Sequence, residues 1–169
     1  MNLKDVAQLQ YRDFEEDSFS FLRAKTALAT RGDPREVTVY LTDELKVLID
    51  KWGNPDKSPG NYVFPIYQKG ASVYEKHYAC RAFVRLVNDR MKKIAQKLGI
   101  EQKVTSGISR HSFSTQLKRC GASTEFIQEA LGHTDKRTTE YYLGSFEKSV
   151  KKEFAHVLTS FKKPEETAE

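Results

Sequence analysis

Two segments near the start of the chain are rich in residues that favour β-strands. They cover positions 19–23 and 36–41, and the second alternates apolar and polar side chains. The Gly-Asp-Pro sequence at 32–34 lies between them and is typical of a turn. This pattern predicts a β-hairpin. Its connecting loop carries three basic residues, Lys25, Arg31 and Arg35.

Apolar residues at helical spacing predict helices over much of the remaining chain. The expected helices cover residues 1–9, 43–52, 73–98, 110–119, 124–131 and 145–161. Ser72 and Glu75 have the sequence pattern of a capping box, and Thr42 and Ser123 are typical N-cap residues. A short apolar run at 62–66 predicts one further extended segment. Together these elements predict a mainly α-helical domain with a small antiparallel β-hairpin, an α+β fold.

The longest expected helix, at 73–98, has an apolar stripe along one side. The members of this stripe are Phe83, Val84, Val87, Met91, Ile94, Ala95 and Leu98. We expect the stripe to be buried, and the basic residues on the opposite side to form a solvated helix face.

Length and composition narrow the class of protein. The chain has 169 residues, of which 38% are hydrophobic and 30% charged, and this balance is typical of one soluble domain. No apolar run reaches the ~18 residues that a membrane span needs, and the first twenty residues lack the apolar segment of a signal peptide. The two cysteines are far apart, which argues against a zinc site or a disulfide framework and favours a reducing cytosol. The net charge of +5 permits a polyanionic partner.

Three short motifs follow one another in the second half of the chain. They are Arg-His-Ser-Phe-Ser-Thr at 110–115, Leu-Gly-His at 131–133 and Thr-Thr-Glu-Tyr-Tyr at 138–142. The first motif places Arg110 at the expected start of a helix. His133 follows Arg110 by 23 positions, and Tyr142 follows His133 by nine.

These motifs resemble the catalytic C-terminal domain of the tyrosine recombinases, the phage-integrase family. That family has an R-H-x-x-A-T helix, an L-G-H turn and a tyrosine nine residues after the histidine. The resemblance covers nearly the whole chain, and is in particular to the integrases of conjugative transposons and related bacterial mobile elements. It implies a catalytic domain at 1–163, truncated at its N-terminal side, and we expect a disordered acidic tail at 164–169.

Carried over by position, the resemblance implies a set of catalytic roles. Tyr142 would be the nucleophile that forms a 3′-phosphotyrosyl bond with DNA, with its neighbour Tyr141 as the alternative. Arg110 would hold two phosphoryl oxygens, because a guanidinium presents paired donors and stays charged. His133 would bind the scissile phosphate. Lys25 would protonate the leaving 5′ oxygen.

Two positions depart from the family pattern. The first catalytic arginine normally lies in T-G-x-R-x-x-E, but here Asn2 takes the place of the arginine and Asp5 that of the acid. A substitute could come from Arg12, from Arg23 or from a residue upstream. A second family histidine falls at Gly107, and His111 is the candidate for part of its role.

The resemblance also implies partners and a cellular setting. The partners would be double-stranded DNA and other recombinase protomers on that DNA, in a bacterial cytoplasm and with no membrane. The helix at 145–161 would dock on another protomer or pack on its own domain, and we expect a monomer without DNA. No metal, nucleotide or redox cofactor is implied. The expected DNA contacts are Arg31, Arg35, Lys118 and Arg119, although the last two could equally be plain surface residues.

Three functions therefore remain open from the sequence. The first is a site-specific recombinase that integrates or excises a mobile element by cleaving and rejoining DNA through Tyr142. The second is a catalytically decayed DNA-binding module, which Asn2 and Gly107 favour. The third is a helical interaction domain with incidental similarity, against which the ordered motifs argue.

Overall fold

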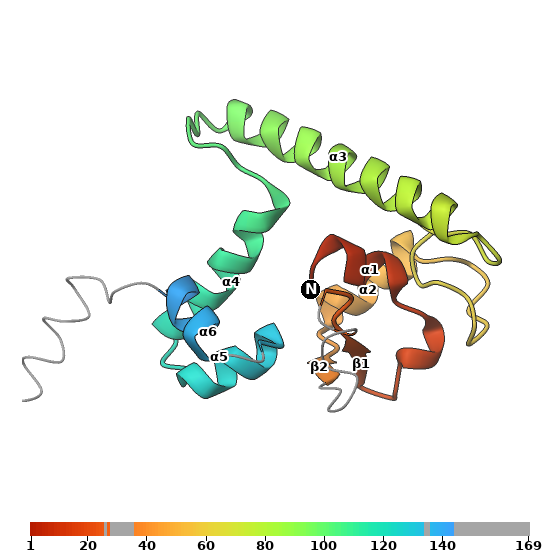
Figure 1. The fold of residues 1–169 in the computed structure, drawn as a ribbon, viewed down its shortest axis with the longest axis horizontal. Coiled ribbons are helices and arrows are strands. Elements are labelled where there is room, and N and C mark those ends of the chain that lie inside the picture. Colours follow the sequence, from red (N-terminus) through yellow and green to blue (C-terminus); the bar gives the residue numbers. More distant parts are fainter. Residues whose placement is uncertain (26, 28–35, 134–135, 144–169) are drawn as a thin grey trace, which may run out of the picture.

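The computed structural model describes residues 1–25, 27, 36–133 and 136–143. Within these residues, helices lie above and to one side of a two-stranded antiparallel sheet (Figure 1). The elements in chain order are α1 (Leu3–Gln8), the 3₁₀ helix η1 (Tyr11–Asp13), β1 (Ser18–Leu22), β2 (Glu36–Tyr40), α2 (Asp43–Trp52), α3 (Val73–Lys97), α4 (Ser106–Arg119), α5 (Thr124–Leu131) and α6 (Lys136–Leu143). The predicted α+β fold is confirmed.

The hairpin predicted from the strand-forming segments is present. β1 and β2 pair so that Ser20 lies opposite Thr38, and the two hydroxyl oxygens are 2.9 Å apart. Phe19 of β1 is buried in a small core with Leu9, Ile49 and Val63, which come from three other parts of the chain. This packing fixes the register of the hairpin, because a shift by one residue would turn Phe19 to solvent. Two predicted DNA contacts, Arg31 and Arg35, lie outside the described residues.

The short apolar run at 62–66 does not form the extended strand that we expected. Tyr62 makes a single bridge with Gln10, and the backbone N–H of Val63 donates to Leu9 O. The run ends there because Phe64 and Ile66 turn back on each other through a backbone hydrogen bond. Its apolar residues therefore contribute to the core without joining the sheet.

The predicted helix caps are in place. The hydroxyls of Thr42, Ser72 and Ser123 each accept a hydrogen bond from a backbone N–H of the first turn. Glu75 also accepts from the backbone N–H of Ser72, which completes the capping box. These interactions are local, so the sequence alone is sufficient to find them.

Helix α4 begins four residues earlier than the motif at 110–115 predicted. The backbone N–H of Ser106 donates to the side chain of Asn88 on α3, and this contact anchors the first turn of α4. Residues 105–107, Thr-Ser-Gly, have low helix propensity, so this turn was not predicted. Arg110 consequently lies in the second turn of α4, not at its start.

The apolar stripe of α3 is only partly buried. Ala95 is buried, and Phe83, Val84, Val87 and Met91 are half-buried. Ile94 and Leu98, however, are 50% and 68% exposed, which contradicts their predicted burial. Among the described helices, α3 makes its main contacts with α1 and α4, and its C-terminal turns extend past α1 (Figure 1).

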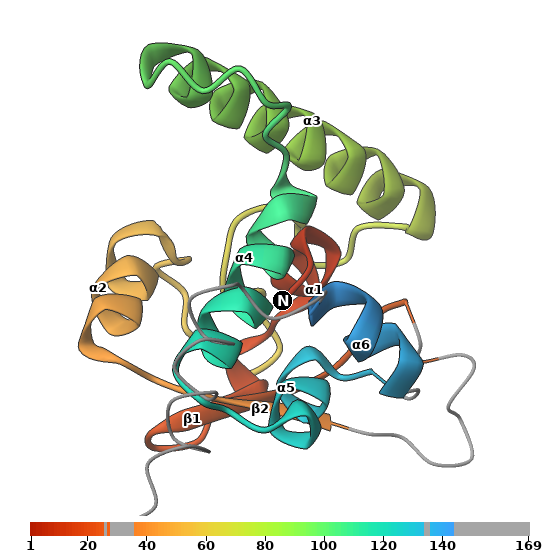
Figure 2. The same cartoon turned by 90° about the vertical axis from the view of Figure 1, so that its left-hand side faces the viewer.

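Helices α4, α5 and α6 pack against one another and meet the hairpin through α5. Each pair of the three is in contact, and α5 also contacts β2, as Figure 2 shows. Ile127 and Leu131 of α5 are fully or almost fully buried at this junction. The contact between α5 and β2 therefore joins the three helices to the hairpin. The expected helix at 145–161 and the tail at 164–169 lie outside the described residues.

Candidate active site

The Leu131-Gly132-His133 turn is the centre of the site, and its shape is that of a helix C-cap. Gly132 has a left-handed backbone, with φ 59° and ψ 41°. The N–H of His133 donates to Gln128 O, and that of Gly132 to Glu129 O, which is the hydrogen-bond pattern of a Schellman motif. The Gln128 side chain also donates to His133 O. The backbone of the turn is thus fixed on both sides of the glycine.

Two arginines donate to successive carbonyls of this turn. Nη2 of Arg110 on α4 donates to Leu131 O, and Nη1 of Arg23, just after β1, donates to Gly132 O at 2.7 Å. The last carbonyls of a helix lack partners inside the helix and carry its negative dipole end, so they attract cations. The end of α5 thereby brings together two guanidinium groups from distant parts of the chain.

His133 is held in a defined tautomer beside these arginines. Its ring is 6% exposed, its Nε2 lies 3.1 Å from Nη2 of Arg110, and its Nδ1 lies 2.9 Å from Oγ1 of Thr139. Because a guanidinium nitrogen only donates, Nε2 of His133 accepts. The proton of the neutral ring is therefore on Nδ1 and is donated to Thr139.

The surroundings of His133 keep it neutral at physiological pH. Burial, followed by the positive charges of Arg110, Arg23 and Lys25, lowers its pKa from 6.5 to about 4. Arg110 acts at contact distance, because its Nη2 lies against Nε2 of the ring. A neutral His133 adds no charge of its own, and its Nε2 remains a hydrogen-bond acceptor.

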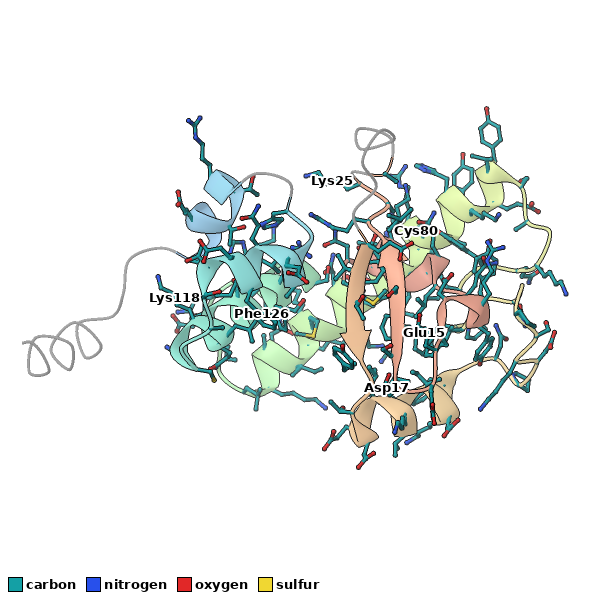
Figure 3. The ribbon with its side chains drawn as sticks, turned by 90° about the horizontal axis from the view of Figure 1, so that it is seen from below. Glu15, Asp17, Lys25, Cys80, Lys118 and Phe126 are labelled. Carbon is teal, nitrogen blue, oxygen red and sulfur yellow. The ribbon has the colours of Figure 1, made fainter. Side chains whose placement is uncertain are left out.

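Asp5 positions the segment that carries Arg23 and Lys25. Its carboxylate is buried and accepts hydrogen bonds from the backbone N–H groups of Asn2 and Ala24, each at 2.9 Å. The start of α1 is thus tied to the turn that follows β1. Lys25 is exposed at that turn, at the opposite end of β1 from the acidic residues Glu15 and Asp17 (Figure 3).

Helix α6 brings the tyrosine motif to the same place. Thr139 is fully buried, and its hydroxyl contacts His133. Position 142 lies three residues later, so it shares a face of α6 with Thr139, whereas position 141 lies about 160° around the helix from Thr139. The backbone of α6 therefore favours Tyr142 over Tyr141 as the residue nearer to His133; both side chains lie outside what the structure describes.

Other predicted residues lie at the edges of this cluster. Nζ of Lys118 donates to Leu143 O at 3.2 Å, which caps the C-terminal end of α6 and gives this lysine a positioning role that its sequence did not indicate. Arg119 is exposed at the end of α4. His111 is exposed one position after Arg110, about 100° around α4. Gly107 lies in the exposed first turn of that helix.

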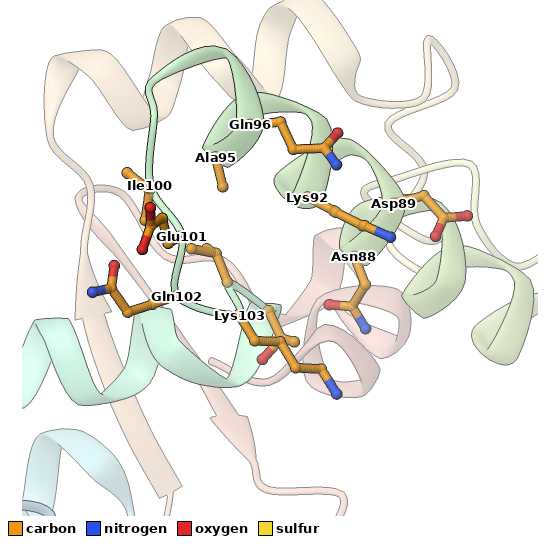
Figure 4. A pocket seen from close by; sticks show the side chains of 11 residues that line it. Asn88, Asp89, Lys92, Ala95, Gln96, Ile100, Glu101, Gln102 and Lys103 are labelled. Carbon is orange, nitrogen blue, oxygen red and sulfur yellow. The ribbon is translucent and has the colours of Figure 1, made fainter.

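Two recesses lie near these elements but lack the chemistry of a phosphate site. One borders Gly132 and His133 and is lined by Glu36, Glu125 and Glu129, whose carboxylates repel an anion. The other lies where α3 meets the segment leading to α4, and its lining mixes both signs of charge (Figure 4). The positive side of the site is therefore the side of Arg23, Lys25 and Arg110.

The sequence identified Arg110, His133 and Lys25. The structure brings Arg110 and His133 into contact and places Lys25 on the turn that Asp5 ties to the start of α1. The sequence did not assign roles to Thr139 or Gln128, which orient the ring and the backbone of His133. Their signals were their spacings: Gln128 is five residues before His133, as a Schellman motif requires, and Thr139 is one helical turn before Tyr142.

The model of the phage integrase family matches residues 6–149, which include the whole cluster from Arg23 to Tyr142. The chain belongs to this family. Among the described residues, no helix is long and apolar enough to cross a membrane.

Individual relatives agree with this membership. The chain is 46% identical over 52 residues to tyrosine recombinase XerD of Listeria monocytogenes, a match over 31% of this chain and 18% of that protein. It is 33% identical over 76 residues to XerD of Lacticaseibacillus casei, covering 45% of this chain and 26% of the relative. The matched region thus spans about a quarter or less of these relatives' length.

Solved structures share the fold. The XerH site-specific recombinase on a palindromic difH substrate has a TM-score of 0.62 and 21% identity, over 94% of this chain and 42% of that one. The Tn1549 transposon integrase in complex with a circular intermediate DNA has a TM-score of 0.60 and 15% identity, over 92% and 54%. At these identities the likeness establishes the arrangement of the helices and the hairpin.

Proposed function

We propose that this chain is the catalytic domain of a site-specific tyrosine recombinase that integrates or excises a mobile element. It binds double-stranded DNA and cleaves and rejoins one strand through Tyr142. The observation that carries the proposal is the cluster of Arg110, His133 and Arg23 around the end of α5, with α6 beside it. Family membership supports the same function.

The arrangement accounts for each part of the reaction. The Tyr142 oxygen attacks the phosphorus as its hydroxyl proton passes to Nε2 of His133, the bond from phosphorus to the 5′ oxygen breaks, and a 3′-phosphotyrosyl link forms. Arg110 binds non-bridging oxygens, on which negative charge builds in the transition state. Lys25, exposed at the turn after β1, donates a proton to the leaving 5′ oxygen. Religation is the reverse of these steps.

His133 and the start of α6 orient the reacting groups. Arg110 shares its Nη2 between Leu131 O and His133 in the absence of DNA. A phosphate offers a charged acceptor in place of these neutral ones, so Arg110 exchanges them when DNA binds. Nε2 of His133 takes up the proton that Tyr142 loses and then donates a hydrogen bond to the phosphate, while the Nδ1 contact with Thr139 keeps the ring aligned during this change.

The alternative is a DNA-binding module that has lost catalysis. Asn2 is the observation that favours it, since the acid at Asp5 is retained while the arginine position before it is uncharged. Under this alternative the same basic cluster would bind DNA, but Tyr142 would form no covalent link.

Covalent trapping separates the two functions. A nicked suicide duplex built from the element's ends loses a short fragment on cleavage, so the protein–DNA link cannot be resealed. We expect the 169-residue chain, or the complete reading frame that contains it, to form an adduct that mass spectrometry maps to Tyr142. Tyr142→Phe should form none, and the matched variant Tyr141→Phe should retain it. DNA binding without an adduct from either protein would establish the alternative.

A further inference from the structure

Arg23 is a buried cation without a carboxylate partner among the described residues. Arg23 is 8% exposed, Arg110 is half-buried beside it, and Lys25 is near enough to act on His133. The buried carboxylate of Asp5, which contacts Ala24 beside Arg23, already accepts from two backbone N–H groups. In the part of the chain that the structure describes, Arg23 forms no ion pair. A buried guanidinium without a carboxylate is costly unless an anion arrives to pair with it.

Arg23 also keeps a donor unused. Its Nη1 donates to Gly132 O, whereas its Nε is buried and has no hydrogen-bond partner among the described residues. A buried donor without a partner costs about 1–3 kcal/mol, so such groups occur where a ligand supplies the acceptor. Arg23 therefore has a donor left for a ligand, in addition to the one that binds the turn at Gly132.

The position of Arg23 relative to Arg110 suits one phosphate. Their hydrogen bonds end on the carbonyls of residues 131 and 132, whose Cα atoms are about 3.8 Å apart in any trans chain. A phosphodiester has two non-bridging oxygens, and two adjacent guanidinium groups can each bind one. Gly132 makes this approach possible, since a Cβ there would lie 2.5 Å from Cδ of Arg23.

We propose that Arg23 binds the same scissile phosphate as Arg110 and supplies the positive charge that Asn2 does not. This assignment rests on the proposed function and names a catalytic residue for it. The rival Arg12 is exposed on η1, where its backbone is bonded to the loop at Pro59 rather than to the site. The start of α1, by contrast, is close to the cluster: burial and the charges of Arg110 and Arg23 lower the pKa of the Met1 amino group.

The first test removes the charge of the phosphate instead of the charge of the protein. A methylphosphonate at the scissile position replaces one charged oxygen with a methyl group. We expect Arg23→Gln to cleave the ordinary suicide duplex about 100-fold more slowly than the parent, and this deficit to shrink at least tenfold on the methylphosphonate duplex. Arg12→Gln should match the parent on both. A misfolded or merely destabilised variant would keep its full deficit on the methylphosphonate duplex, and that result would overturn the proposal.

The second test does not depend on cleavage. Each phosphate contact contributes about 0.9 to the slope of log K against log salt concentration for duplex DNA. Arg23→Gln should lower that slope by about 0.9, while Arg23→Lys, which keeps the charge, and Arg12→Gln should leave it unchanged. An unchanged slope for Arg23→Gln would refute the phosphate contact even if the parent forms the Tyr142 adduct. A lowered slope with no adduct from the parent would support the contact and reject the recombinase.

The third test moves the charge back to α1. Because residue 2 lies at the start of α1, beside the two arginines, Asn2→Arg in the Arg23→Gln background should recover at least tenfold of the lost cleavage rate. A matched Gln8→Arg change at the exposed end of α1 should recover none. Equal recovery by both changes would show a general effect of net charge and would count against the proposal.

Discussion

The two halves of the site differ in how closely they keep the family pattern. The helices α4, α5 and α6 carry all three expected motifs, and Arg110 and Thr139 from two of them contact His133. The half formed by α1 and the hairpin lacks the expected arginine, yet it places Arg23 and Lys25 at the same point. The difference suggests that the position of a charge near the phosphate matters more than the element that supplies it.

Among the variants considered, loss of Arg110 on α4 should have the largest effect on the rate of DNA cleavage. Arg110→Ala removes the guanidinium shared by Leu131 O and His133, and we expect adduct formation to slow by about 10²- to 10³-fold. Single-turnover trapping on the suicide duplex measures this rate. Arg90→Ala, an exposed arginine on α3, serves as the control. Equal rates for the two variants would remove Arg110 from the reaction.

The low pKa of His133 should make stability depend on pH. Because the folded pKa is about 4 and the ordinary value 6.5, the unfolded chain binds more protons between these pH values. His133 therefore contributes no penalty above pH 6.5, and stability falls by up to about 3 kcal/mol as the pH drops through 4.

Urea unfolding at pH 7 and pH 4 tests this expectation. The fall in the free energy of unfolding should be smaller in His133→Gln than in the parent, since glutamine does not titrate. His77→Gln, on the exposed side of α3, should show the full fall. If His133→Gln and His77→Gln responded alike, His133 would not be the buried neutral group described.

A side chain at Gly132 should disturb the contact between α5 and the hairpin, because Arg23 and Val37 pack against this glycine. Gly132→Ala puts a Cβ on a left-handed residue and within 2.7 Å of Cγ2 of Val37 as well as against Arg23. We expect a loss of about 2 kcal/mol in the free energy of unfolding. Gly107→Ala meets only Oγ1 of Thr105 at 3.6 Å and should be neutral or stabilising by up to ~1 kcal/mol. Thermal or urea unfolding measures the stability of both variants. Equal changes in their free energies of unfolding would contradict this expectation.

The smallest expected effect is at Lys118. Lys118→Met keeps the aliphatic stem but removes the donor to Leu143 O, and should cost about 1 kcal/mol of stability. Lys93→Met, at an exposed position of α3, should cost nothing measurable by urea unfolding. If both variants lost the same small amount of stability, Lys118 would be a plain surface residue, which was the alternative left open by the sequence.

Features governed by neighbours in the sequence were predictable. The strand propensity of the hairpin, the caps at Thr42, Ser72 and Ser123 and the helix end at Gly132 each depend on a few adjacent residues. The three motifs likewise identified Arg110 and His133 as members of one site.

Features governed by distant contacts were not predictable. The first turn of α4 depends on Asn88 of α3, and the exposure of Ile94 and Leu98 depends on which helices cover α3. The choice among Arg12, Arg23 and an upstream residue stayed open for the same reason. The choice depends on the hydrogen bond between Asp5 and Ala24 and on the packing of Arg23 against Gly132. Both contacts are between residues that are far apart in the sequence.

The central claim is that both halves of the molecule bind one DNA phosphate. A crystal structure of Tyr142→Phe on an intact recombination half-site would test it by measuring the distances from each guanidinium to the scissile phosphate. The account predicts that Arg23 and Arg110 each lie about 2.7–2.9 Å from a non-bridging oxygen, with His133 beside them. A phosphate held by Arg110 and His133 alone, with Arg23 still donating only to Gly132 O, would contradict it.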